Sequence, residues 1–164
     1  MIILGIDPGL ALMGYGIIEF ERQKIKLIQY GCIETQAKSP TPQRLRSIFL
    51  GVNQLIDTDK PDEIACEEQV FARNVTTAMN VGAARGVALV AAAQRTEELY
   101  EYTPMQIKQA VTGYGKADKA QVQQMVKMIT GMDSIIRPDD AADAVAAAIC
   151  HAHSRNARQM FKIT

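Results

Sequence analysis

Acidic side chains occur at three separate places where a buried element is predicted to end or begin. Asp7 follows an apolar run at the start of the chain and precedes Pro-Gly, a pattern typical of a buried strand that stops at a turn. Glu67 and Glu68 end a second short apolar run. Asp140 and Asp143 lie three residues apart near the start of a predicted helix, so they share one helix face. Taken singly, such acids often bond to a turn or stabilise a helix N-terminus.

Taken together, these acids indicate a metal site. Carboxylate oxygens from separate elements are the ligands that Mg²⁺ or Mn²⁺ prefers. Two such ions roughly 4 Å apart can activate a water and stabilise the leaving oxygen during phosphodiester cleavage. A metal would also offset the cost of burying Asp7. Glu67 and Glu68 point to opposite faces of an extended strand, so we expect only one of them to join Asp7, and alternation alone does not decide which.

The elements that must position these acids alternate between strands and helices. Apolar runs and turn residues predict strands over residues 2–7, 13–20, 25–33, 63–68 and 99–103. Helical spacing predicts helices over residues 44–56, 74–94, 104–110, 119–130 and 138–153. The first three strands form a meander with the first strand central, and the strand–helix–strand order that follows predicts a parallel crossover. The sequence therefore predicts an α/β fold with a mixed central sheet flanked by helices.

The composition is that of one globular domain, which we place at residues 1–154, followed by a basic and loose tail at residues 155–164. No apolar stretch is expected to reach the length of a membrane span. The chain has three widely spaced cysteines and two histidines, a set that argues against zinc and favours the reducing cytoplasm.

Charge is distributed unevenly along the chain. The formal net charge is zero, which argues mildly against a protein that simply coats nucleic acid. Residues 69–96 contain no acid and three arginines, Arg73, Arg85 and Arg95. A basic segment in the middle of the chain, placed beside an acidic metal site, would suit a phosphate-binding surface. We predict that Arg73 contacts nucleic acid.

Several short motifs occur in the same order in a known family. The opening Ile-Leu-Gly-Ile-Asp-Pro-Gly (3–9) and the following Gly-Tyr-Gly (14–16) closely resemble the start of the RuvC family of Holliday-junction resolvases. The likeness continues through Glu-Gln-Val-Phe (68–71), Ala-Arg-Gly-Val-Ala (84–88), Gln-Ile-Lys-Gln (106–109) and Asp-Ala-Ala-Asp-Ala (140–144). It covers nearly the whole chain, so chance is an implausible explanation.

The resemblance implies a ribonuclease H-like fold and a homodimer. It implies a structure-selective endonuclease, dependent on Mg²⁺ with Mn²⁺ as a substitute, that nicks paired strands of a four-way DNA junction. It further implies work alongside a branch-migration motor of the RuvA-RuvB type in recombination and repair. The Ala-rich helix with Gly82 and Gly86 is our candidate for the dimer contact, although close packing within the chain is an equal explanation.

The family's four catalytic acids fall on Asp7, one Glu of the pair, Asp140 and Asp143. The Glu-Gln-Val-Phe motif points to Glu68, whereas gapless counting from Pro61-Asp62 and from Arg73-Asn74 points to Glu67, which we predict. In this mechanism Asp7 bridges two metals, Glu67 binds one of them, and the two helix acids complete the other or orient its water.

The family's basic positions near the scissile phosphate fall on Lys108 and Lys119, which we expect to neutralise transition-state charge. Lys116 is grouped with them as a DNA contact, although a solvated surface lysine is its alternative. The family stacks a Phe on junction bases. Gapless counting places Val70 at that position and Phe71 next, so Phe71 either stacks on DNA or belongs to the core.

Three alternatives compete with this interpretation. A RuvX-type nuclease acting on RNA shares the Gly-Ile-Asp-Pro-Gly opening but is usually shorter and lacks the basic middle. An actin-like or sugar-kinase ATPase shares Gly-Ile-Asp-x-Gly but needs two domains and a longer chain. A junction-binding module that has lost catalysis would have no use for four carboxylates facing phosphates.

Overall fold

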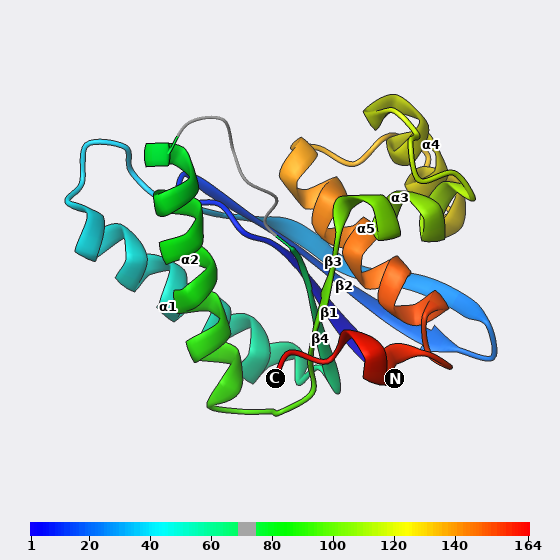
Figure 1. Cartoon of the computed structure of the whole chain (residues 1–164), viewed down its shortest axis with the longest axis horizontal. Helices are drawn as coiled ribbons and strands as arrows, with labels where there is room; N and C mark the ends of the chain where they lie inside the picture. The colour runs from blue at the N-terminus through cyan, green and yellow to red at the C-terminus, as the bar shows by residue number, and fades with distance from the viewer. Residues whose placement is uncertain (69–74) are drawn as a thin grey trace.

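A computed structural model describes residues 1–68 and 75–164, and in it a five-stranded mixed sheet lies between two layers of helices (Figure 1). The strands follow the order β3-β2-β1-β4-β5. Their bounds are Ile2–Asp7 (β1), Leu12–Glu21 (β2), Lys24–Glu34 (β3), Glu63–Glu67 (β4) and Leu99–Tyr102 (β5). β1 pairs antiparallel with β2 and parallel with β4, so the predicted meander and crossover, with β1 at the centre, are confirmed.

The helices divide between the two faces of the sheet. In Figure 1 α1 and α2 lie on one side of it, and α3, α4 and α5 lie on the other. Their bounds are Thr41–Asp59 (α1), Val75–Ala93 (α2), Pro104–Thr112 (α3), Lys119–Thr130 (α4) and Asp139–His153 (α5). The predicted mixed α/β architecture is confirmed.

Side-chain alternation along β1 builds a separate core on each face. Ile3 belongs to the cluster beneath α3, α4 and α5, whereas Leu4 and Ile6 belong to the cluster beneath α1 and α2. β4 follows the same rule, because Ala65 faces α5 while Cys66 faces the other layer. Odd-numbered residues of both strands therefore face α5, since successive side chains of a strand point to opposite faces.

Residues 155–164 were expected to form a loose tail, and their contacts show otherwise. A 3₁₀ helix (η1) spans Arg158–Phe161, and the Arg158 guanidinium lies 2.7 Å from a carboxylate oxygen of Glu63. Beyond it, Lys162 forms a β-bridge with Tyr100, and the Ile163 N–H donates to the Leu99 carbonyl over 2.9 Å. Two of the basic residues that suggested a solvated tail, Arg158 and Lys162, pair with Glu63 and Glu98 at this sheet edge.

α2 differs from the expectation that no apolar stretch reaches the length of a membrane span. Among the described residues, this helix alone is long and apolar enough to cross a membrane by length and composition. Its buried residues, however, are the alanines Ala84, Ala88, Ala91 and Ala92, which belong to the cluster shared with α1. Small side chains let two helices approach closely, so packing within the fold explains the alanines of α2, whereas Val75, Met79 and Val90 are exposed.

Candidate active site

Asp7 is the last residue of β1 and lies on the α5 face of the sheet. It follows the alternation of Ile3 and Gly5, which point toward α5. The next residue is Pro8, which lacks a backbone N–H, and β1 stops there. An apolar strand thus delivers a carboxylate to a partly buried position at the end of the central strand.

Glycines in β1 and β2 allow α5 to cross the sheet at close range. A Cβ on Gly5 would lie 2.0 Å from the carbonyl oxygen of Ala144, and one on Gly14 would lie 2.0 Å from that of Asp140. No larger residue fits at these two positions without a shift of backbone. The N-terminal turns of α5, with Asp140 and Asp143, are therefore held against the end of β1.

β4 presents Glu67 and not Glu68 to this site. Glu67 ends β4 beside β1, one residue after the parallel pair Ile6 and Cys66, and it lines a cavity together with Asp143. Glu68 is exposed and lines a different pocket, near Arg85. The structure brings Glu67 to the α5 face, where Asp7 lies.

The pKa values of these acids are raised first by burial and then by their charges on one another. Burial, followed by the charges of Glu67, Asp143 and Asp140, raises the pKa of Asp7 to about 8. Burial and the charge of Asp143 raise the pKa of Glu67 to about 7, and burial chiefly raises that of Asp143. Lys119 opposes the shift at all three acids. Buried acids that raise one another's pKa make a site that favours a cation.

Two lysines lie at the same cavity, which has a volume of about 250 Å³. Lys108, on α3, and Lys119, on α4, line it with Glu67 and Asp143. The Lys119 Nζ lies 3.2 Å from Asp143 Oδ2 and 3.2 Å from Asp139 Oδ2. The cavity therefore combines carboxylates with ammonium groups, as a site for a phosphate and its counter-ion requires.

Capping boxes fix the helices that carry these lysines. Thr103 accepts a hydrogen bond from the Gln106 N–H, and the Gln106 side chain returns one to the Thr103 N–H, which starts α3. Asp118 and Gln121 form the same arrangement at α4. Lys119 is the residue directly after the cap, so its backbone position is set by the start of the helix.

The sequence places Asp139 in the acidic cluster at the predicted helix start, but only Asp140 and Asp143 were assigned a role from it. It is the first residue of α5, and its carboxylate accepts hydrogen bonds from Gln123 over 2.9 Å and from Arg137. Hydrogen bonding by Lys119 lowers the pKa of Asp139. A signal was present in the sequence, because Lys119 and Gln123 lie four residues apart on one face of a helix.

A divalent cation fits this site by donor chemistry. Asp7, Glu67, Asp140 and Asp143 are hard oxygen donors, and the raised pKa values show that positive charge is in deficit there. Within residues 1–68 and 75–164, no three acidic, His or Cys side chains stand close enough to enclose a metal. The acids therefore surround the site without forming a closed cage around one point.

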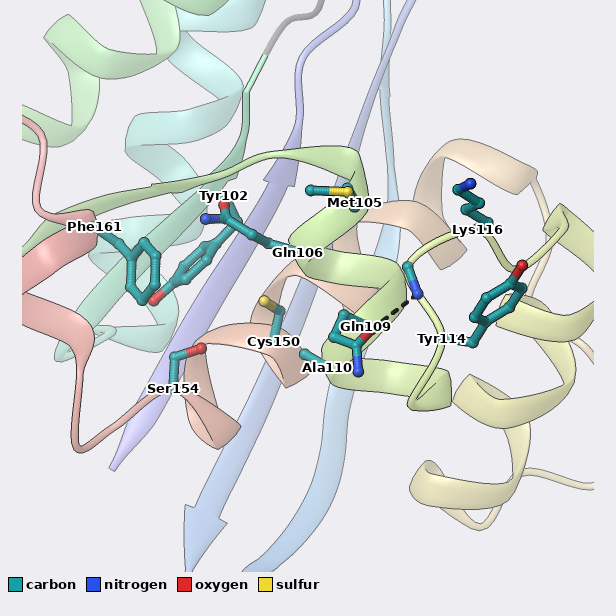
Figure 2. Close-up of a pocket in the computed structure, with 11 residues that line it drawn as sticks. Tyr102, Met105, Gln106, Gln109, Ala110, Tyr114, Lys116, Cys150, Ser154 and Phe161 are labelled. Atoms are coloured by element: carbon teal, nitrogen blue, oxygen red, sulfur yellow. Dashed lines mark hydrogen bonds between the residues drawn. The ribbon is translucent and has the colours of Figure 1, made fainter.

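The remaining predicted DNA contacts have different outcomes. Lys116 is exposed on the loop after α3 and lines a separate pocket of about 540 Å³. Figure 2 shows it with Tyr114 on the side of that pocket opposite Tyr102 and Phe161. The structure thus does not bring Lys116 into the cavity lined by the carboxylates. Phe71 and Arg73, and with them Val70, lie outside the described residues.

A mixed sheet with carboxylates at two adjacent strand ends and on the helix that crosses them defines a ribonuclease H-like nuclease. The family model described as "Crossover junction endodeoxyribonuclease RuvC" matches residues 3–151. The chain belongs to the RuvC family.

Individual relatives agree along nearly the whole chain. Crossover junction endodeoxyribonuclease RuvC of Alkaliphilus metalliredigens is 55% identical over 163 residues, which are 99% of each chain. The protein of the same name from Clostridioides difficile is 49% identical over 162 residues, covering 99% of this chain and 96% of that one.

Among solved structures, Thermus thermophilus RuvC in complex with a Holliday junction substrate has a TM-score of 0.90 at 37% identity, covering 98% of this chain and 96% of that chain. The predicted family and ribonuclease H-like fold are confirmed, and the protein is an endonuclease. The alternatives of an RNA-directed nuclease and of an inactive junction-binding module are not favoured.

Proposed function

We propose that this protein resolves four-way DNA junctions by paired, metal-dependent nicking during recombination and repair. The observation that carries the proposal is the electrostatic coupling of Asp7, Glu67 and Asp143 beside two lysines at one cavity. The likeness to a RuvC in complex with a Holliday junction substrate supports the choice of DNA. Acids alone would repel a phosphodiester, so the lysines and a bound cation must supply the positive charge.

Mg²⁺ is the proposed cofactor, at one or two sites, with Mn²⁺ as the expected substitute. Asp7, Glu67, Asp140 and Asp143 would hold it. A bound divalent ion supplies a water of lowered pKa and stabilises the leaving oxygen. The raised pKa values mean that Asp7 and Glu67 hold protons near neutral pH in the metal-free site, which relieves part of the repulsion, and cation binding would release them.

Lys108 and Lys119 have a separate role in the proposal. Their side chains line the cavity next to Glu67 and Asp143, so their ammonium groups can face a non-bridging phosphate oxygen. Positive charge placed where negative charge develops stabilises the transition state. Phe71, Arg73 and Lys116 are proposed to contact the junction outside this cavity, with Phe71 stacking on bases.

The proposed assembly is a homodimer, because a junction offers two symmetry-related strands to cut. Exposed apolar side chains and two glycines lie at helical spacing along α2. We call this set the α2 stripe, and its members are Val75, Met79, Gly82, Gly86 and Val90. A symmetric contact along the α2 stripe would bury these side chains. A branch-migration motor of the RuvA-RuvB type is the proposed partner, and the cytoplasm the proposed location.

Cleavage of synthetic substrates tests the proposal. A four-way junction, a linear duplex and an RNA duplex are each incubated with Mg²⁺ or with EDTA. We expect symmetric nicks in the junction alone, abolished by EDTA and by Asp7→Asn. Cleavage of RNA, or binding without nicking, would refute the proposal.

The two adjacent glutamates provide a matched pair of variants. Glu67→Gln should slow cleavage by at least about 100-fold, because it removes a charge from the cation site. Glu68→Gln removes the same charge from the next residue and should leave the rate within about threefold of the parent, as expected for an exposed side chain outside the site. Equal losses in both variants would overturn the assignment of Glu67.

A further inference from the structure

Asp139 is the point where three donors from two segments, α4 and the connection before α5, meet. Its Oδ2 lies 3.2 Å from Lys119 Nζ, and its Oδ1 accepts from Gln123 Nε2 over 2.9 Å and from Arg137 Nη1. The residue begins α5, whereas Lys119 and Gln123 belong to α4. Its carboxylate therefore joins two of the helices that border the catalytic cavity, α4 and α5.

Gln123 fixes the position of this carboxylate. It is 7% exposed, although its side chain is an amide, and a buried amide needs a hydrogen-bond partner. Asp139 provides that partner. Because Lys119 and Gln123 are four residues apart, the same face of α4 approaches Asp139 at two points. A carboxylate held by a buried amide is a firmer anchor than one held by solvent-exposed charges alone.

Lys119 needs such an anchor. Its side chain is 53% exposed, and ordering a long lysine side chain costs rotamer entropy. Its other partner is Asp143, which is one of the proposed cation ligands. A single exposed ion pair orders a lysine weakly. If Asp143 were to bind a cation, Asp139 would still hold the ammonium at the cavity.

We propose that Asp139 is a positioning residue that, together with Gln123, holds the Lys119 ammonium at the edge of the catalytic cavity. This inference rests on the proposed function, because Lys119 is taken to face the scissile phosphate. Asp139 itself does not contact the reacting atoms in this scheme. Its effect on cleavage passes through Lys119.

Single-turnover cleavage and junction binding in EDTA separate this role from a general loss of structure. Asp139→Asn should slow cleavage by about tenfold, because a misplaced catalytic group loses much of its effect. Junction affinity should stay equal or rise, since a negative charge is removed near DNA phosphates. Asp139→Glu should recover part of the rate. Asp133→Asn, which removes a charge from the connection between α4 and α5, is the matched control and should leave the rate unchanged.

A double-mutant cycle then tests whether Asp139 acts through Lys119. In a Lys119→Met background, Asp139→Asn should cost less than about twofold, because the group that it positions is gone. Gln123→Met should slow cleavage less than Asp139→Asn does, and the two losses should not add. An unchanged rate in Asp139→Asn, weaker junction binding with it, or the same loss in both Lys119 backgrounds would overturn the proposal.

A measurement without DNA or metal keeps the inference apart from the proposed function. NMR of lysine-labelled protein reports the order of the Lys119 ε-methylene group. We expect it to be more ordered in the parent protein than in Asp139→Asn, with Asp133→Asn like the parent. If the parent nicked no junction, this difference would still support the positioning role, and its absence would refute it.

Discussion

The phenol oxygen of Tyr102 lies 2.7 Å from Nδ1 of His151, in the buried layer between α5 and the sheet. The other ring nitrogen, Nε2, lies 2.6 Å from Glu63 Oε2, and Arg158 lies 2.7 Å from Glu63 Oε1. A neutral imidazole suits both contacts, because Nε2–H can donate to Glu63 while Nδ1 accepts from Tyr102. Arg158 then supplies the charge that a buried carboxylate requires.

This network should make stability depend on pH. Burial lowers the pKa of His151 from 6.5, so the unfolded chain takes up the proton first as the pH falls. The stability that His151 contributes is therefore present above pH 6.5 and is lost below it. The gap in unfolding free energy between the parent and His151→Gln should shrink by about 1 kcal/mol from pH 7.5 to 5.5. Urea titrations at both pH values measure it.

His153→Gln is the control for that experiment, because it removes an exposed histidine from the same helix. The pH-dependent change in the gap should be specific to His151→Gln. A gap for His151→Gln that widens toward pH 5.5 would mean that the imidazole is protonated in the folded protein.

The contact between Gly5 and α5 predicts a large effect from a small change. Gly5→Ala places a Cβ against the Ala144 carbonyl, where only a shift of backbone can relieve the overlap. We expect the free energy of unfolding to fall by about 3 kcal/mol or more, as for overpacked cores. Ile3→Val, on the same face of β1, should cost only about 1 kcal/mol. Thermal melts of both variants test this, and similar melting temperatures would contradict it.

Asp7 should destabilise the metal-free fold at neutral and higher pH. Burial and neighbouring acids raise its pKa from 3.8 to about 8, so its favourable contribution is lost as the pH rises toward 8. Asp7→Asn should therefore stabilise the protein in EDTA, by about 1–3 kcal/mol at pH 8 and by less at pH 5. Glu68→Gln, at an exposed neighbouring acid, should stay within about 0.5 kcal/mol of the parent. A destabilised Asp7→Asn at pH 8 would contradict this prediction.

Adding Mg²⁺ should reverse the order of these stabilities. The cation binds the folded parent and shifts its unfolding by mass action. Asp7→Asn lacks one proposed ligand, so its melting temperature should rise less. Differential scanning fluorimetry with increasing Mg²⁺ measures both, and equal shifts would indicate binding away from Asp7.

The α2 stripe predicts how the dimer can be broken. Met79 is 70% exposed on it, and Met79→Glu would place a charge in the proposed contact. We expect the dimer dissociation constant to rise at least about 100-fold, because a buried unpaired charge is costly. Leu50→Glu changes a side chain that is 53% exposed on α1 and should leave the dimer intact. Sedimentation equilibrium measures the dissociation constant of each variant. Loss of the dimer in both variants would argue against the α2 stripe as the dimer contact.

Much of the fold follows from local patterns in the sequence. Apolar strands bounded by Pro-Gly and helices with regular apolar spacing were predicted close to their observed bounds, because these signals are local. Asp7, Asp140 and Asp143 could be singled out for the same reason, since acids at strand ends and helix starts are visible in the chain itself.

Other parts of the site depend on contacts that only the folded chain defines. The choice of Glu67 over Glu68 depends on which residues of β4 share the α5 face, which the pairing with β1 determines. Lys116 was grouped with Lys108 and Lys119 as a DNA contact, but it lines another pocket. The proposed positioning role of Asp139 depends on its hydrogen bond with Gln123. Gln123 becomes buried only when the chain folds, so its sequence position does not reveal this contact.

The pairing of residues 158–164 with β5 also affects how the protein behaves at high concentration. A strand at the edge of a sheet offers unpaired N–H and C=O groups to other chains, which is a common route to aggregation. Lys162 and Ile163 occupy those groups on Tyr100 and Leu99. The opposite edge, β3, carries alternating charges such as Lys24 and Lys26, which discourage pairing. Removal of residues 158–164 would thus leave the edge of β5 unpaired and reduce solubility.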